Sequence, residues 1–429
     1  MDVKTAFLNG ELDEEKYMEI PDGLFSDPKI KEFKVCKLKR TLYGLKISPK
    51  KWNKKFTKEA IKLGLENDLH EPCLFTWRKN GKFVILVLYV DDIILTGNDV
   101  EKMTEIKISL SNVFKMKDLG EPEVFLGMKI IRDKNNQTMK LVQKDYVNKI
   151  LTRFNMFESN PKNTPMITRQ AKSKSNNLGD SKELTSAPYR AAIGSLLYLA
   201  GATRPDIAYA VNKLSRKQMN PTVDDWEDVK RVFRYLKGTS DLGLIYKGKH
   251  DNMEAITDAS FQDCEESKST GGFVIKLFGD TVAWRSHKQA ITTKSTCAAE
   301  YVGMSEVCDD VISLDKAIRD MLGRTMYPVT IWTDNKSAKD CTQMDGSHKL
   351  KSFDYSLEEI LQRLKERENT GKKREMTVAH GDYIKACAMK GIVKVEWIAS
   401  TENDADIMTK ALPYNAHEYL RNKIMNLER

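Results

Sequence analysis

The apolar run FVILVLYVDDIILTG, residues 83–97, constrains the fold of this chain more than any other segment. Apolar residues stand on both sides of the acidic pair Asp91-Asp92, and a run this rich in β-branched residues favours a buried strand. The pattern predicts a buried β-hairpin over residues 82–96 that turns at the aspartates. Burying carboxylates costs free energy unless a cation compensates them, and oxygen ligands suit Mg²⁺. For the dipeptide alone, a solvated Asp-Asp turn is the alternative.

The chain is long enough for two or three domains, because 429 residues exceed what one ordinary core supports. Its 41% hydrophobic and 31% charged residues predict a folded protein. The net charge of +9 is compatible with a polyanionic partner without requiring one. Seven cysteines without a C-x-x-C pair argue against a disulfide framework or zinc ribbon, and favour a reducing, intracellular setting. Since neither an apolar membrane span nor a signal peptide is seen, we expect a soluble protein that is not secreted.

Periodicity predicts an N-terminal part, a linker, a helical part and a C-terminal α/β part. The stretch 159–186, rich in Asn, Ser, Lys and Thr, has the composition of a linker. Helical spacing predicts helices near residues 52–63, 100–114, 189–199, 207–214, 226–236 and 297–322. Strands of the C-terminal part are expected over residues 255–258, 272–278, 282–288, 329–333 and 393–398. The expected fold class is α/β, with a mixed sheet in the C-terminal part.

Four acids of the C-terminal part form a second candidate site. Asp258 and Asp334 are expected to end strands, Glu300 to lie in the first turn of the long helix, and Asp406 near the start of the last helix. Strand ends and helix starts along one edge of a sheet can converge, and acids are tolerated near helix N-termini. Each acid taken alone is more often a helix cap or a surface charge, so both interpretations stay open.

Several separate segments together resemble the Pol polyprotein of copia-type LTR retrotransposons. The segments that resemble its reverse transcriptase are MDVKTAFLNGEL, CKLKRTLYGLKISPKKW, LYVDDIILTG and DLGEPEVFLGMKI. Two later segments, YRAAIGSLLYLAGATRPDIAYAVNKLSR and RVFRYLKGT, resemble the part of the same polyprotein that continues the reverse transcriptase. The segments that resemble its ribonuclease H domain are ITDASFQDCEESKSTGGFVI, KSTCAAEYVG, IWTDNKSA and NDADIMTKAL. Because many segments agree in order and spacing, the resemblance is specific and covers nearly the whole chain.

For the reverse transcriptase, the resemblance implies an α+β palm in which Asp2, Asp91 and Asp92 hold two Mg²⁺ ions, with Mn²⁺ as the alternative metal. Phe7 would crowd the ribose 2′ position, although a core aromatic is the alternative for this residue. Ile47 departs from the family, which has Gln there. Lysines between residues 34 and 55 interleave with apolar residues, as a phosphate-binding surface would, or as a solvated basic face. The residues expected to bind substrate are Phe7, Tyr43, Gly44, Lys46, Pro49 and Tyr89.

For the ribonuclease H domain, the resemblance implies that Asp258, Glu300, Asp334 and Asp406 bind two Mg²⁺ ions. The predicted reaction is attack of a metal-activated water on an RNA phosphodiester in an RNA/DNA hybrid. Ala298 stands where the family has Glu. Neither His348 nor His380 fits the family's histidine position, so no catalytic histidine is assigned.

The implied organisation is a palm with the start of the thumb (1–158), a linker (159–186), a helical thumb or connection (187–250) and a ribonuclease H-like domain (251–429). The implied partners are RNA template, DNA primer, RNA/DNA hybrid, dNTPs and other Pol- or Gag-derived proteins, with no membrane. The expected location is the cytoplasm, in virus-like particles, or the nucleus. Because Asp2 is the second residue, we expect the preceding fingers to be missing and polymerase activity to be impaired. A catalytically inactive, nucleic-acid-binding remnant is the alternative to a two-activity enzyme.

Overall fold

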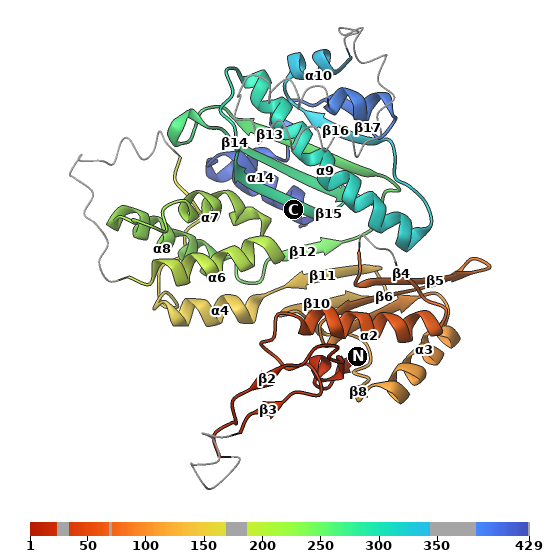
Figure 1. Cartoon of the computed structure of the whole chain (residues 1–429). Helices are drawn as coiled ribbons and strands as arrows, with labels where there is room; N and C mark the ends of the chain where they lie inside the picture. Colours follow the sequence, from red (N-terminus) through yellow and green to blue (C-terminus); the bar gives the residue numbers. More distant parts are fainter. Residues whose placement is uncertain (24–33, 68–70, 169–186, 344–382, 428–429) are drawn as a thin grey trace. The chain divides into compact units, whose positions relative to one another are not determined.

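The computed structural model describes residues 1–23, 34–67, 71–168, 187–343 and 383–427 (Figure 1). They form two compact units, the first made of Met1–Pro122 with Lys316–Arg324 and the second of Glu123–Asp315 with Thr325–Arg429. The division into four segments made above remains a prediction, and most of its linker, as well as His348 and His380, lies outside the described residues. Within these ranges no helix is both long and apolar enough to cross a bilayer.

The first unit is built on a six-stranded antiparallel sheet in the order β4-β5-β6-β7-β1-β8. The hairpin predicted over residues 82–96 is present as β6 and β7, which pair from Val84↔Gly97 to Tyr89↔Asp92. The strands are β1 (Asp2–Val3), β4 (Glu66–Asn67), β5 (Leu74–Lys79), β6 (Lys82–Tyr89), β7 (Asp92–Gly97) and β8 (Met116–Lys117). A separate hairpin joins β2 (Tyr17–Met18) to β3 (Cys36–Lys37).

Two helices, α2 (Ser48–Lys62) and α3 (Val100–Val113), pack on this sheet and form the core of the first unit (Figure 1). Alternate residues of β6 are buried in that core, as the period of a strand requires. From α2, Trp52 and Phe56 are buried at positions one helical turn apart and meet the ring of Phe114 with centroid distances of 5.1 and 5.9 Å. The apolar spacing in the sequence therefore predicted the buried face of α2 correctly.

The second unit begins with a four-stranded antiparallel sheet in the order β12-β11-β10-β9, which the sequence analysis did not predict. Its strands are β9 (Val124–Phe125), β10 (Met128–Asp133), β11 (Thr138–Val142) and β12 (Gly243–Tyr246). Helices α4 (Lys144–Arg153), α6 (Tyr189–Ala202), α7 (Ala208–Ser215) and α8 (Val223–Gly238) share one apolar cluster. The last three are the helices expected over residues 189–236.

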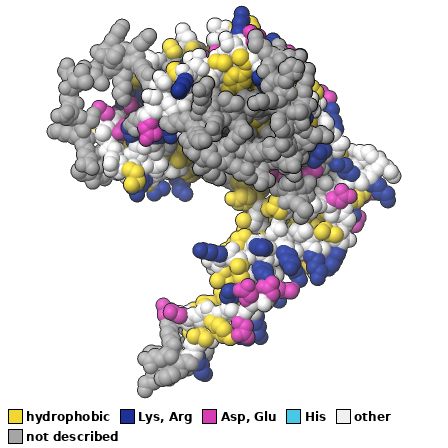
Figure 2. Space-filling model, turned by 45° about the horizontal axis from the view of Figure 1, so that its top comes forward, with side chains coloured by type: hydrophobic (Ala, Val, Ile, Leu, Met, Phe, Trp, Pro, Cys, Tyr) yellow, Lys and Arg dark blue, Asp and Glu magenta, His cyan; other side chains and the backbone are white. Residues whose placement is uncertain are grey.

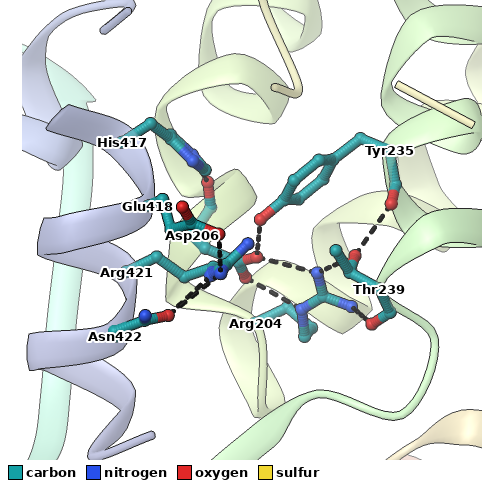
Figure 3. Close-up of polar contacts among 8 residues, drawn as sticks. All are labelled: Arg204, Asp206, Tyr235, Thr239, His417, Glu418, Arg421 and Asn422. Atoms are coloured by element: carbon teal, nitrogen blue, oxygen red, sulfur yellow. Dashed lines mark hydrogen bonds and ion pairs between the residues drawn. The ribbon is translucent and has the colours of Figure 1, made fainter. Parts of the chain in front are cut away.

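A buried polar network ties these helices to α14 (Tyr414–Met425) within the second unit (Figure 3). Arg204 is 1% exposed and binds Asp206 through two hydrogen bonds of 2.8 and 2.7 Å. The Tyr235 hydroxyl donates to the same Asp206 carboxylate at 2.6 Å, and the backbone oxygen of Asp206 lies 3.1 Å from Nε2 of His417. Arg204 also donates to the backbone oxygen and the hydroxyl of Thr239. Because both charges are paired and further hydrogen-bonded, their burial is tolerated.

The second unit also contains a mixed five-stranded sheet in the order β15-β14-β13-β16-β17, as the α/β prediction requires. The first three strands are antiparallel, whereas β16 runs parallel to β13 and to β17. The strands are β13 (Met253–Ser260), β14 (Thr270–Leu277), β15 (Asp280–Lys288), β16 (Val329–Thr333) and β17 (Val393–Trp397). The long helix α9 (Thr296–Leu322) crosses one face of this sheet, and α14 lies on the other (Figure 1).

Candidate functional site

Three of the four predicted acids of the C-terminal part converge at one edge of the five-stranded sheet. Asp258 lies on β13, Asp334 follows the last residue of β16, and Asp406 is the first residue of α13 (Asp406–Thr409). One carboxylate oxygen of each lies within 4.8 Å of the others. Because β13 and β16 are parallel neighbours, their C-terminal ends bring Asp258 and Asp334 to the same edge.

Glu300, the fourth acid, reaches this edge from α9 and is 4% exposed. Its Oε1 accepts a hydrogen bond of 3.2 Å from the backbone N–H of Ala259, the neighbour of Asp258. Its Oε2 is buried and has no hydrogen-bond partner among the described residues. Glu300 lies in the second turn of α9, since the helix begins at Thr296. Sequence analysis had placed it in the first turn.

The packing of α13 on β14 brings Asp406 close to Asp258. Gly272 of β14 pairs directly with Asp258, and a Cβ on this glycine would lie 2.5 Å from Cβ of Met408 on α13. The hydroxyl of Thr409 donates to Oδ2 of Asp258. A glycine is therefore required here because the backbone of α13 approaches the sheet so closely.

The electrostatics of the cluster favour a cation. Burial, followed by the charges of Asp258 and Asp334, raises the pKa of Glu300 well above its ordinary value. Burial and the charge of Asp258 raise the pKa of Asp406 to about 7, and burial raises the pKa of Asp258. The ammonium of Lys410 lies 2.7 Å from Oδ1 of Asp406 and 3.6 Å from Oδ2 of Asp258, so one cation already compensates part of this charge.

These residues fit a hard divalent ion. Carboxylate oxygens are the ligands that Mg²⁺ and Mn²⁺ prefer, and Mg²⁺ usually keeps several waters beside one or two carboxylates. Asp258, Asp334, Asp406 and the unpartnered oxygen of Glu300 supply such a set. Asp334 is additionally held by the Ser400 hydroxyl, which donates to its Oδ2 at 2.7 Å.

The second predicted acid set lies on the sheet of the first unit. Asp2 of β1 and Asp92 of β7 are direct partners across two antiparallel strands, and Asp91 lies in the turn that precedes β7. Burial, followed by the charges of Asp91 and Asp2, raises the pKa of Asp92. In the described part of the chain, however, these three do not bring one ligand atom each within 4.8 Å of one another.

The turn that carries Asp91 is held in a strained conformation. Val90 has a φ of 57°, which is unfavourable for a β-branched residue. Its carbonyl accepts a hydrogen bond of 2.6 Å from the indole N–H of Trp52, and the carbonyl of Asp91 accepts one of 2.8 Å from the N–H of Val3. Helix α2 and strand β1 therefore fix the turn together.

Among the residues expected to bind substrate, the structure brings Phe7 and Tyr43 together, with ring centroids 4.7 Å apart. Tyr43 and Tyr89 are 52% and 54% exposed. Gly44 adopts a φ of 96°, Lys46 is exposed, and Pro49 lies in the first turn of α2. The substrate-binding role of these residues remains a prediction.

Sequence reasoning did not identify Lys410, Thr409, Ser400 or Gly272. The spacing of four residues between Asp406 and Lys410 on a helix could have indicated that pair. No local signal connects Ser400 with Asp334 or Gly272 with α13.

Comparison with known proteins decides the family. The family described as "Reverse transcriptase (RNA-dependent DNA polymerase)" matches residues 1–168. The putative transposon Ty5-1 protein of Saccharomyces cerevisiae is 31% identical over 316 residues, which cover 72% of this chain and 100% of that protein. The chain belongs to the Pol family of copia-type retrotransposons. It contains the reverse transcriptase domain of a retrotransposon Pol, as the resemblance implied.

Other Pol proteins match over more of this chain. The retrovirus-related Pol polyprotein from transposon TNT 1-94 of Nicotiana tabacum is 34% identical over 424 residues, 97% of this chain. The chain spans only 30% of the length of that polyprotein. A solved foamy viral protease-reverse transcriptase in complex with an RNA/DNA hybrid is matched with a TM-score of 0.44 and 14% identity, over 93% of this chain and 46% of that one. The mixed sheet of the second unit agrees with the α/β fold class that was expected.

Proposed function

We propose that the C-terminal acid cluster of this Pol protein cleaves the RNA strand of RNA/DNA hybrids with the help of divalent metal ions. The observation that carries the proposal is the convergence of Asp258, Asp334 and Asp406 within 4.8 Å. These residues and Glu300 would hold Mg²⁺ or Mn²⁺, two ions in the full site. Metal ions bound there would lower the pKa of a water and stabilise the leaving oxygen in phosphodiester hydrolysis.

The protein's own contribution is to hold the carboxylates in place. Ser400 fixes one oxygen of Asp334, Thr409 fixes one of Asp258, and the N–H of Ala259 fixes one of Glu300. Each hydrogen bond leaves the other oxygen of that carboxylate available as a ligand. The site is therefore oriented before a metal arrives, which reduces the cost of assembling it.

The first unit supports a second activity, DNA synthesis on an RNA template from a DNA primer and dNTPs. Its support is the pairing of Asp2 with Asp92 next to the fixed turn at Asp91. The exposed lysines of α2 recur every fourth residue and so lie along one face of the helix, and Figure 2 shows Lys and Arg side chains gathered on this unit. These lysines are Lys50, Lys54, Lys58 and Lys62. Such a row suits the phosphates of a nucleic-acid strand.

The test of the nuclease is cleavage of a labelled RNA/DNA hybrid with Mg²⁺ or with chelator. The Asp334→Asn variant removes a ligand, and Asp340→Asn removes an exposed acid of the neighbouring helix α10 (Lys336–Gln343) as the matched control. We expect metal-dependent cleavage by the wild type and the control, and a loss of at least about 100-fold in Asp334→Asn. Hybrid binding without cleavage by the wild type would instead support the catalytically inactive remnant.

The polymerase is tested separately by primer extension on an RNA template. Asp92→Asn should abolish extension, whereas Glu105→Gln, an exposed acid on α3, should leave it unchanged. Extension that survives in Asp92→Asn would refute the assignment of this palm site. Partners beyond the nucleic acids are proposed to be other Pol- or Gag-derived proteins, in the cytoplasm or the nucleus.

A further inference from the structure

We propose that a cavity of about 470 Å³ in the second unit binds a phosphate group of a nucleic-acid backbone, away from the acid cluster. The inference rests on the proposed nucleic-acid function and adds a site to it. The cavity is lined by the loop 161–168, by Arg231 of α8 and by residues 412–414, which connect α13 to α14 and include the first residue of α14. Two of its lining side chains, Lys162 and Arg231, are cations, and none of the described residues that line it is an acid. Its charge therefore suits an anion.

Arg231 supplies the main argument. Its Nη2 donates a hydrogen bond of 2.8 Å to the hydroxyl of Thr164, while its Nε is buried without an acceptor among the described residues. Nε of Arg234, three residues further along α8, is in the same situation. Burial, with the positive charge of Arg234 adding to it, lowers the pKa of Arg231 against the opposing effect of Asp228. Because Arg231 as a whole is only half-buried and lines the cavity, a phosphate would be bound by the accessible part of its guanidinium and not by the buried Nε.

Neutral donors complete the cavity. The hydroxyl of Thr164 accepts from Arg231 and is 8% exposed, so its own hydrogen is free to point at an anion. The amide of Asn163 and the hydroxyl of Thr168 line the same cavity, and the exposed Lys162 adds a mobile positive charge at its rim. Guanidinium, hydroxyl and amide groups are donors that proteins use to bind phosphate.

The place of the cavity along the chain argues for a nucleic-acid phosphate. Its wall at residues 412–414 follows Lys410 of the acid cluster almost directly, and Leu412 also lines the small cavity that Lys410 lines. A strand with one phosphodiester at the acid cluster carries further phosphates every few ångströms. A contact to one of them fixes the register of the strand without reading its sequence. The cavity would thereby help to select which phosphodiester reaches the carboxylates.

The experiment compares Arg231→Gln with Lys230→Gln, a control on the same helix whose lysine pairs with Glu227 and does not line the cavity. Binding of a fluorescent RNA/DNA hybrid is measured in chelator over a range of salt concentrations. We expect Arg231→Gln to bind about 10-fold more weakly, with a salt slope reduced by about 1, because one phosphate contact is lost. Lys162→Gln should bind the hybrid a few-fold more weakly. Its melting temperature should equal that of the wild type, because Lys162 is exposed. Equal affinities and slopes for Arg231→Gln and Lys230→Gln would overturn the proposal.

A second experiment distinguishes free phosphate from the phosphate of a nucleic acid as the ligand of the cavity. It also distinguishes failure of the cavity proposal from failure of the proposed function. Inorganic phosphate should raise the melting temperature of the wild type more than that of Arg231→Gln, since general salt effects are common to both. If phosphate stabilises the wild type but Arg231→Gln leaves the salt dependence of hybrid binding unchanged, the cavity binds free phosphate and has no role in binding the strand. Stabilisation by phosphate in a wild type that binds no hybrid would refute the proposed function while supporting the cavity as a phosphate site. Absence of both effects would overturn the cavity as well.

Discussion

Replacing Lys410 by methionine should destabilise the metal-free protein and tighten its binding of Mg²⁺. The ammonium lies 2.7 Å from Asp406 and 3.6 Å from Asp258. At 2.7 Å, Coulomb's law gives about 6 kcal/mol for an effective dielectric constant of about 20 and about 1.5 kcal/mol for bulk water. Because the Lys410 side chain is 41% exposed, screening favours the lower figure, and we expect a loss of about 1–2 kcal/mol.

The same interaction opposes the metal, because a divalent ion must share the carboxylates with the ammonium or displace it. If the metal-bound forms of wild type and variant are equally stable, the loss in the metal-free form reappears as metal affinity. About 1.4 kcal/mol corresponds to a tenfold tighter dissociation constant for Mg²⁺.

The assay is thermal unfolding in chelator and in Mg²⁺, with calorimetric titration of the metal. The melting temperature of Lys410→Met should fall by about 2–4 °C per kcal/mol in chelator and approach that of the wild type in saturating Mg²⁺. Lys410→Arg, which keeps the charge, should resemble the wild type in both. If Lys410→Met binds Mg²⁺ no more tightly than the wild type, or is equally destabilised with and without the ion, the reasoning is refuted.

Three further changes test the packing and titration of the second unit. Gly272→Ala should lower both stability, by about 1–3 kcal/mol, and hybrid cleavage, because its Cβ would overlap α13; chemical denaturation and the cleavage assay measure the two effects. Arg204→Met should cost about 3–5 kcal/mol in urea unfolding, since it leaves the Asp206 carboxylate buried without its cation. In chelator, the contribution of Asp406 to the free energy of unfolding should decline as pH rises from about 4 to about 7. The reason is that the folded state raises the pKa of Asp406 to about 7 and so binds its proton more tightly than the unfolded state does. Asp406→Asn should flatten the dependence of stability on pH in this range.

Each of these predictions has a control. Gly271→Ala introduces a Cβ whose nearest neighbours are the flexible side chains of His287 and Gln289, so a smaller loss than in Gly272→Ala is expected. Replacing Arg204 and Asp206 together by apolar residues should cost less than Arg204→Met alone, because no unpaired charge remains. A pH profile that stays unchanged in Asp406→Asn would show that another group titrates in that range.

The elements that could be predicted from the sequence are those with strong local patterns. The β6–β7 hairpin is specified by two apolar runs on either side of an acidic turn, and α2 by a buried stripe at helical spacing. The five strands of the mixed sheet were each expected within a few residues of their observed bounds, because they are short apolar runs that alternate with helices.

The four-stranded sheet could not be predicted because its information is not local. β9 has only two residues, four of the six residues of β10 are exposed, and β12 pairs with β11 from about a hundred residues further along the chain. The Arg204 network has the same character, since His417 lies 211 residues from Asp206. Polar residues that look like ordinary surface positions in the sequence become buried only when distant helices meet.

The two acid sets show where prediction from motifs reaches its limit. A motif indicates which carboxylates belong together, but their mutual distance depends on the elements that carry them. In the second unit, two parallel strand ends and a helix packed against Gly272 point three carboxylates at one place. In the first unit, Asp2 and Asp92 are strand partners and Asp91 sits in a turn fixed by Trp52, so their backbones are adjacent while the three side chains spread over more than 4.8 Å. The acid cluster of the second unit is thus the better organised of the two, and its variants should give the clearer results.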